Sequence, residues 1–310
     1  MILVAGSANL DFVVRAHHIP GPGETVLGQQ FCTYPGGKGA NQAVACARAG
    51  GAPTQMLLAL GQDAYAEPLL DSLRSAGVVL HTVLAPDQPT GCAFICVAGN
   101  AENAITVAPG ANAFLQSQHL PDLAGVSHLL MQLEIALPTV MAYAQAARAR
   151  GVQVVLNAAP AQALPDELLQ AVDVLIVNEG ELAALVSHPG SFVLNLAQLA
   201  VPCVVVTLGH RGCVARVGNT FLTQPAFDVQ AVDTTGAGDT FCGVLVAKLS
   251  QGAGMVAAMR QASAAAALAC TVAGAQSSIP SAAALAEFLA LAAPNGVDDE
   301  ADLRRYCGLG

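Results

Sequence analysis

The sequence predicts an α/β fold in which helices cover both faces of a mainly parallel β-sheet. Short, almost wholly apolar runs alternate along most of the chain with alanine-rich stretches of helical length. Apolar runs of this length are typical of strands buried on both faces, and strands that alternate with helices form parallel sheets. The 310 residues are enough for one large domain with an appendage or for two domains, and no internal repeat divides them.

Buried strands are expected at residues 2–6, 55–60, 128–132, 153–157, 174–178 and 204–207. Helices are expected between them, over residues 41–49, 138–150, 179–186 and 191–199. A further helix should follow Asp233, because a polar turn there passes through Gly236-Ala237-Gly238 into small apolar residues.

Two segments depart from this alternation. Residues 11–14 with 25–34, and residues 91–97 with 104–108, have strand-like patterns with no helix between them, and Gly99-Asn100 suits a hairpin turn. We expect these segments to form a small antiparallel β lid that projects from the main sheet over a site. The acidic tail, residues 294–310, is expected to be loosely held.

The composition argues against several classes of protein. Hydrophobic residues make up 54% of the chain, but the uncharged run at 261–286 is too interrupted for a membrane span. The apolar residues 1–4 lack a basic leader, so they are expected to start a strand and not a signal peptide. A net charge of −10 with only two lysines disfavours nucleic-acid binding.

The cysteines and histidines indicate neither a disulfide framework nor a zinc site. The nine cysteines include no C-x-x-C pair, and the seven histidines show no metal-ligand spacing. We therefore expect a soluble, cytoplasmic protein with no nucleic-acid or membrane partner.

The segment from Asp233 to Gly243 has the pattern of an anion-binding loop. Glycines at 236 and 238 let the backbone approach a ligand closely, and the first amides of the following helix have no intrahelical partner. Asp239 lies in the first turn of that helix, beside the loop. On these residues alone, a simple helix cap at Asp239 is as good an interpretation.

A second group of polar residues lies near the N-terminus. Asn9 and Asp11 follow the first buried strand, and ligands of open α/β sheets bind at the carboxyl ends of strands. Gly36-Gly37-Lys38-Gly39-Ala40-Asn41 is another glycine-rich helix start. Its spacing is wrong for a P-loop or a Rossmann fingerprint, but its donors and acceptors suit vicinal hydroxyls.

These two glycine-rich segments together resemble the two signatures of the ribokinase-like (phosphofructokinase-B type) sugar kinases. The resemblance extends from Gly6-Ser7 to Gly274-Ala275-Gln276. It implies a three-layer α/β/α sandwich, with one kinase domain over residues 1–293 and lid segments at about 11–34 and 91–108. The activity it implies is ATP-dependent phosphorylation of a free sugar.

The resemblance also implies a role for each matching residue. Asp239 would be the catalytic base, and the amides of Gly236, Ala237, Gly238 and Asp239 would form an anion hole. The residues implied in sugar binding are Asn9, Asp11, Gly37, Lys38, Gly39, Asn41, Glu134 and Asp239. Those implied in ATP binding are Asn178, Glu181, Thr207, Leu208, Gly209, Gly212, Gly238 and Ser263.

Two metal ions are implied as well. Glu181 would act through water on Mg²⁺, although Asn178 and Glu181 also fit an ordinary helix start. A monovalent cation, usually K⁺, would be held near Asp233, Thr235, Ala269, Val272, Gly274 and Ser278. Ser263 departs from the Asn or His that relatives commonly have near the adenine, which leaves the base contacts open.

D-Ribose, phosphorylated on its 5-hydroxyl, is the leading substrate that the resemblance implies. The alternatives are a kinase for deoxyribose, another pentose or a nucleoside, and a non-catalytic sugar sensor. A sensor would be expected to lack Asp239 or the glycine loop, and both are present. The resemblance further implies a homodimer formed through the lid.

Overall fold

A computed structural model describes residues 1–99, 102–186, 191–292 and 297–309 of the chain. Within these residues nine strands form one sheet in the order β13-β12-β11-β10-β9-β8-β1-β4-β5, and only β12 and β13 run antiparallel to their neighbours. Their bounds are β1 Ile2–Ala5, β4 Thr54–Leu60, β5 Val79–Leu84, β8 His128–Met131, β9 Gln153–Asn157, β10 Val174–Asn178, β11 Cys203–Thr207, β12 Gly212–Val217 and β13 Thr220–Pro225. The mainly parallel sheet is therefore confirmed.

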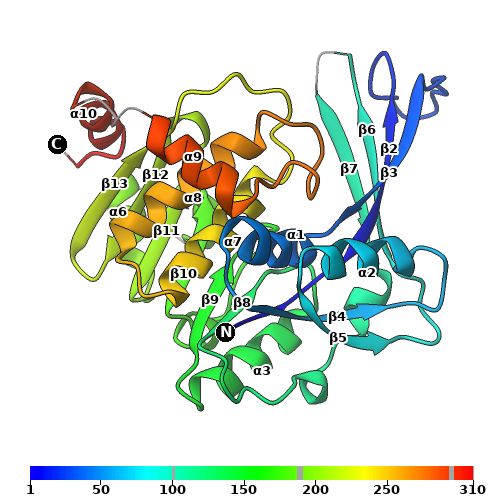
Figure 1. The fold of residues 1–310 in the computed structure, drawn as a ribbon, viewed down its shortest axis with the longest axis horizontal. Helices are drawn as coiled ribbons and strands as arrows, with labels where there is room; N and C mark the ends of the chain where they lie inside the picture. Colours follow the sequence, from blue (N-terminus) through cyan, green and yellow to red (C-terminus); the bar gives the residue numbers. More distant parts are fainter. Residues whose placement is uncertain (100–101, 187–190, 293–296, 310) are drawn as a thin grey trace.

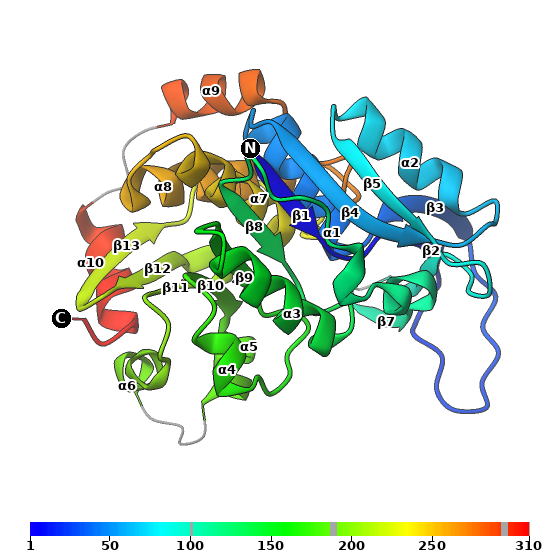
Figure 2. The same ribbon diagram turned by 90° about the horizontal axis from the view of Figure 1, so that it is seen from below.

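Helices cover both faces of this sheet (Figures 1 and 2). Successive side chains of a strand point to opposite faces, so Ile2 and Val4 of β1 belong to one apolar core while Leu3 and Ala5 belong to the other. The first core is closed by α1 Lys38–Val44, π-helix η1 Ala45–Ala49, α2 Ala66–Ser75, α7 Ala237–Ser250, α8 Met255–Ala269 and α9 Ala282–Leu291. The second is closed mainly by α3 Leu137–Arg148, α4 Asp166–Leu169, α5 Glu179–Leu185 and α6 Phe192–Gln198.

A second, four-stranded sheet projects from the first, as Figure 1 shows at the upper right. Its order is β3-β2-β6-β7, with β2 Asn9–Arg15, β3 Gln30–Gly36, β6 Gly91–Val97 and β7 Asn103–Ala108. The expected small antiparallel sheet is present as two antiparallel hairpins, and a parallel pairing of β2 with β6 joins them. The predicted turn at Gly99-Asn100 includes Asn100, which lies outside the described residues.

The C-terminal segment differs from the loosely held tail that its acidic composition predicts. Helix α10 Val297–Tyr306 packs against β13. Leu303 within this helix and Cys307 directly after it are only 3% and 1% exposed. These two side chains lie four positions apart, which places them on one face of a helix. That apolar contact holds the segment on the sheet despite the acidic residues of its first turn.

Several elements have no counterpart in the sequence prediction. The strands β5, β12 and β13 lie at the ends of the main sheet, where one face is partly exposed and the sequence is less uniformly apolar. Among the described residues, no helix combines the length and the apolar character that crossing a lipid bilayer requires.

Candidate active site

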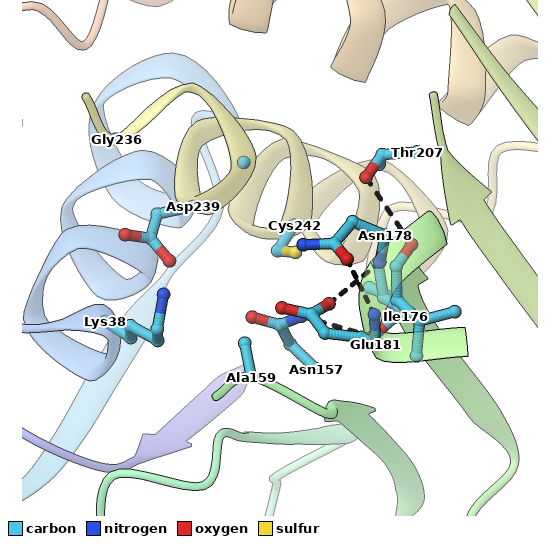
Figure 3. Close-up of a pocket in the computed structure, with 12 residues that line it drawn as sticks. Lys38, Asn157, Ala159, Ile176, Asn178, Glu181, Thr207, Gly236, Asp239 and Cys242 are labelled. Carbon is cyan, nitrogen blue, oxygen red and sulfur yellow. Dashed lines mark hydrogen bonds between the residues drawn. The ribbon is translucent and has the colours of Figure 1, made fainter. Parts of the chain in front are cut away.

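The candidate site lies where five neighbouring parallel strands, β1, β8, β9, β10 and β11, end at the same edge of the sheet. Helices α1, α5 and α7 begin there and enclose a pocket of about 150 Å³. Figure 3 shows Lys38 of α1 and Asp239 of α7 next to one another on one side of this pocket, with Asn178 at the end of β10 and Glu181 of α5 on the other side. The fold thus brings both glycine-rich signatures to one place.

Helix α7 begins with the geometry that the Gly-Ala-Gly pattern predicts. Gly236 is the N-cap with φ 74°, and a Cβ there would lie 3.1 Å from the Cα of Ala275. A side chain is disfavoured at such a positive φ, so glycine suits the position. The amide of Ala237 donates to the Thr234 carbonyl at 3.2 Å, whereas the amides of Gly238 and Asp239 have no hydrogen-bond partner among the described residues. These amides are available to an anion.

Both carboxylate oxygens of Asp239 are held by side-chain amides of α1. The amide nitrogen of Asn41 donates to Oδ2 at 2.9 Å, and that of Gln42 donates to Oδ1 at 2.9 Å. Close packing of α7 on α1 makes this possible, because a Cβ on Gly243 would lie 2.6 Å from the Gln42 carbonyl oxygen. Asp239 is 8% exposed, so its carboxylate is fixed in a largely buried position.

Gln42 belongs to a buried polar chain to which the sequence analysis assigned no role. Its amide nitrogen also donates to Asn157 at 2.9 Å, and its oxygen accepts from Gln132 at 2.6 Å. Gln42 and Gln132 are both fully buried. A glutamine that follows Asn41 directly in a helix with otherwise small residues is the signal that would have identified Gln42, since a buried amide needs partners.

Lys38 and Glu134, two residues predicted to bind the sugar, meet at the start of α1. The Lys38 amide donates to Oε2 of Glu134 at 3.1 Å, and the Ser7 hydroxyl donates to the same oxygen at 2.6 Å. Ser7 in turn accepts from the Gly39 amide at 3.3 Å. A Cβ on Gly39 would lie 2.6 Å from the Ser7 nitrogen, so glycine is needed for this close approach.

Asn9 and Asp11 lie on β2, where the second sheet leaves the main one. Asn112, which the sequence analysis did not single out, donates to Oδ1 of Asn9 at 2.7 Å and is almost wholly buried. Gly36 and Gly37 again allow close packing: a Cβ on Gly36 would meet the Asp11 carboxylate at 2.1 Å, and one on Gly37 would lie 2.7 Å from the Asn9 nitrogen.

The Lys38 ammonium lies among four carboxylates in this site, those of Asp11, Glu134, Glu181 and Asp239. Burial, together with the charges of Glu134 and Asp239, raises the pKa of Asp11 to about 7. The charge of Asp239 raises the pKa of Lys38, with further help from Glu134 and Glu181, and outweighs the effect of burial. Burial raises the pKa of Glu181, although the Asn178 amide and Lys38 oppose it. Lys38 is therefore held in its charged form beside Asp239.

The residues predicted to bind ATP divide into two groups. Asn178 and Glu181 form a reciprocal capping box with two hydrogen bonds of 2.8 Å, and both line the pocket together with Thr207 (Figure 3). Asn178 and Glu181 therefore both cap the start of α5 and line the pocket. Gly238 lines the pocket as well. The remaining residues predicted to bind ATP do not line it; these are Leu208, Gly209, Gly212 and Ser263.

The loop that follows Thr207 is built for a tight reversal. Gly209 and Gly212 have φ of 58° and 111°, and the Leu208 amide donates to the Gly212 carbonyl at 2.8 Å. Leu208 is buried in the core, and Ser263 lies buried on α8 with its hydroxyl 3.6 Å from the Cys213 sulfur.

Asp233 ties the anion-binding loop to the segment after α8. Its Oδ1 accepts from the amide and hydroxyl of Thr235 at 2.9 and 2.7 Å, and its Oδ2 accepts from the Gly274 amide at 2.9 Å. Burial alone would raise the pKa of Asp233, but these hydrogen bonds hold it below its usual value. The Ser278 hydroxyl donates to the Ala275 carbonyl at 2.8 Å, and the Ala269 carbonyl accepts from the Val272 amide at 3.3 Å.

The donor set of this segment suits a hard cation better than a transition metal. The two segments have one carboxylate whose pKa is held low, that of Asp233, together with hydroxyl oxygens of Thr235 and Ser278 and backbone carbonyls. Oxygen atoms of these kinds are the ligands of hard cations. Within the described ranges no three histidine, cysteine or acidic side chains are placed to hold a metal ion together.

Known proteins resemble the chain over nearly its whole length. Ribokinase of Haemophilus influenzae is 40% identical over 301 residues, covering 93% of this chain and 98% of that protein. Deoxyribokinase of Salmonella typhi is 33% identical, covering 94% and 99%. The structure of Arabidopsis thaliana ribokinase complexed with ribose and ATP superimposes with a TM-score of 0.85 at 31% identity, covering 93% and 98%.

Residues 1–282 match the pfkB family of carbohydrate kinases. This range contains the pocket, both glycine-rich signatures and the four carboxylates around Lys38. The chain is therefore a member of the pfkB family of carbohydrate kinases.

Proposed function

We propose that the protein is an ATP-dependent ribokinase, which transfers the γ-phosphate of ATP to the 5-hydroxyl of D-ribose. The observation that carries this proposal is Asp239, held by Asn41 and Gln42 at the start of a helix. Among the described residues, the free amides of this helix start belong to Gly238 and Asp239, which both line the pocket. The full-length similarity to proteins named ribokinase, one of them seen with ribose and ATP, supports the choice of sugar and of phosphate donor.

The sugar would lie next to the pocket, between β2 and the start of α1, where Lys38 and Asp239 line the pocket. Asn9, Asp11, Lys38, Asn41 and Glu134 offer both donors and acceptors to adjacent hydroxyl groups. Ser7 and Asn112 hold Glu134 and Asn9 in place through the hydrogen bonds described above. A preformed set of this kind favours a hydroxyl-rich ligand, because an analogue that lacks a hydroxyl leaves a buried polar group without a partner.

Transfer then needs a base and a site for negative charge. Asp239 accepts the proton of the 5-hydroxyl as that oxygen forms a bond to the γ-phosphorus, and the bond from phosphorus to the β–γ bridging oxygen breaks to release ADP. The amides of Gly236, Gly238 and Asp239, with the Lys38 ammonium, stabilise the charge on the transferring group. The Ala237 amide contributes less in this structure, since it is used in the turn.

Asn178, Glu181 and Thr207 would face the phosphates of ATP. Glu181 is the residue proposed to hold Mg²⁺ through water, and Mg²⁺ would supply neutralisation of the phosphate oxygens. Asp233, Thr235 and the oxygens near Ala269, Val272, Gly274 and Ser278 are proposed to hold a monovalent cation such as K⁺. Gly236, which begins α7, lies close to Ala275, which directly follows Gly274. This close approach supports a structural link between the proposed cation and the amides at the start of α7.

A homodimer through the second sheet is also proposed. Phe31 and Phe94 are 65% and 54% exposed, and both stack on Phe12 on one face of this sheet. Exposed apolar groups that gather on one face mark a contact surface. The cytoplasmic location stays a prediction of the composition.

A coupled ADP-release assay tests the proposal. D-Ribose, 2-deoxy-D-ribose, other pentoses and nucleosides are compared as acceptors, and phosphorus NMR of the product identifies the phosphorylated oxygen. The highest kcat/KM is expected for D-ribose, with phosphate on its 5-oxygen. A higher value for deoxyribose would favour the second candidate, which rests on the similarity to deoxyribokinase. ADP release that no acceptor increases would contradict a sugar kinase.

A further inference from the structure

The C-terminal helix α10 lies beyond the family match, which ends at residue 282, while α10 begins at residue 297. Figures 1 and 2 both place it beside β13, at the end of the main sheet. Leu303 and Cys307 anchor it in the same apolar core as Leu208, and Thr223 of β13 donates a hydrogen bond to Glu300 at 3.1 Å. An ordered helix beyond the matched residues therefore lies next to the loop that follows β11.

Tyr306, the last residue of α10, contacts two segments that belong to the nucleotide side of the site. Its hydroxyl donates a hydrogen bond to a carboxylate oxygen of Glu179, and its ring lies under the Arg211 guanidinium, 4.3 Å from the ring centroid. Glu179 is the first residue of α5, directly after Asn178. Arg211 ends the short 3₁₀ turn Gly209–Arg211, which follows Thr207.

These two contacts join parts of the site that come from different strands. Asn178 ends β10 and Thr207 ends β11, and both residues line the pocket. A tyrosine hydroxyl is protonated near neutral pH and can donate, and the hydrogen bond to Glu179 raises the pKa of Tyr306 further. The guanidinium–ring contact adds an attraction of its own. Tyr306 thus bridges the turn that starts α5 and the loop that follows β11.

We propose that Tyr306 is a positioning residue for ATP: through Glu179 and Arg211 it fixes the spacing between the Asn178–Glu181 turn and the 207–212 loop. The inference rests on the ATP part of the proposed function and on no assumption about the sugar. Because Tyr306 touches neither the sugar-side residues nor Asp239 in the structure, its effect should appear in nucleotide affinity and not in sugar affinity.

The test compares Tyr306→Phe with Thr223→Val in the full-length protein. Tyr306→Phe removes the hydroxyl that reaches Glu179 and keeps the ring under Arg211. Thr223→Val removes the hydrogen bond from β13 to Glu300, and so loosens the same helix at a point away from the pocket. The dissociation constant of ATP with Mg²⁺ is measured by titration calorimetry, and KM values for ATP and sugar are measured in the coupled assay.

Tyr306→Phe is expected to weaken ATP binding and raise the KM for ATP at least about threefold, the size expected for one partly exposed hydrogen bond to a charged group. The KM for the sugar and the melting temperature should stay near wild type, and Thr223→Val should bind ATP normally. ATP affinity that is unchanged in Tyr306→Phe, or lowered equally in both variants, would overturn the positioning role. Wild-type protein that binds no ATP would overturn it together with the proposed function, whereas phosphorylation of another sugar in place of ribose would overturn only the choice of sugar.

Discussion

Replacing Asp239 by asparagine separates a catalytic base from a helix-capping residue. The substitution keeps the shape of the side chain and removes its charge and its ability to accept a proton. The structure also predicts how the new amide would be accommodated. Gln42 can still donate to the remaining oxygen, while the Asn41 amide nitrogen would face another amide nitrogen.

Asn41 has the means to resolve that conflict. Its Oδ1 is buried and has no partner among the described residues, so turning the amide over presents an acceptor to the new nitrogen. An unresolved pair of donors would cost about 1–3 kcal/mol, and the turned amide avoids most of this. The loss of the carboxylate near the helix N-terminus costs about 0.3–1 kcal/mol. We therefore expect Asp239→Asn to fold, with a decrease in the free energy of unfolding of roughly 1 kcal/mol.

The rate should change far more than the stability. General-base catalysis typically contributes about 10²–10⁴-fold, so kcat should fall at least about a hundredfold, which corresponds to about 2.7 kcal/mol of activation free energy. Coupled ADP release gives kcat, calorimetry gives the melting temperature, and ribose titration checks that the sugar still binds. A purified variant that melts normally and phosphorylates ribose within a few-fold of wild type would refute the assignment of Asp239 as the base.

Three further predictions concern Asp11, the cation segment and the second sheet. The folded-state pKa of Asp11 is about 7 and its ordinary value is 3.8, so between these values the native state holds a proton that the unfolded state has lost. The free energy of unfolding should therefore fall as pH rises through this window, by at most about 4 kcal/mol, and it should fall less in Asp11→Asn. Urea unfolding at pH 5 and at pH 8 gives this free energy, and an equal decrease between the two pH values in both proteins would contradict the prediction. Turnover should depend on a monovalent cation of K⁺ size, because Asp233 and the carbonyls after α8 are proposed to hold such a cation near the loop that begins α7; equal kcat in K⁺, Na⁺ and tetramethylammonium buffers would remove this hypothesis. If residues 11–34 and 91–108 close over the sugar, ribose should slow hydrogen exchange of their amides, and unchanged exchange in both segments would count against a closing lid.

The central strands and the loop chemistry were predictable from the sequence because their signals are local. Runs such as 153–157 and 174–178 have an unbroken apolar centre, and the structure has strands with these bounds, β9 and β10. The start of α7 was predictable for the same reason, since the left-handed Gly236 and the following acidic first turn are properties of consecutive residues. Strand termini and glycine turns depend mainly on neighbouring residues, so a linear pattern records them.

Only the tertiary structure decided how the Asp239 carboxylate is held and what covers the nucleotide side. Its hydrogen bond to Asn41 joins residues 198 positions apart, and the chain through Gln42, Gln132 and Asn157 crosses three separate elements. Tyr306 and Glu179 are 127 positions apart, in a helix whose acidic sequence predicts a loose tail. Such contacts depend on which helices pack together and at what distance. Small residues such as Gly243 permit that packing, but their local sequence does not say which partner will lie against them.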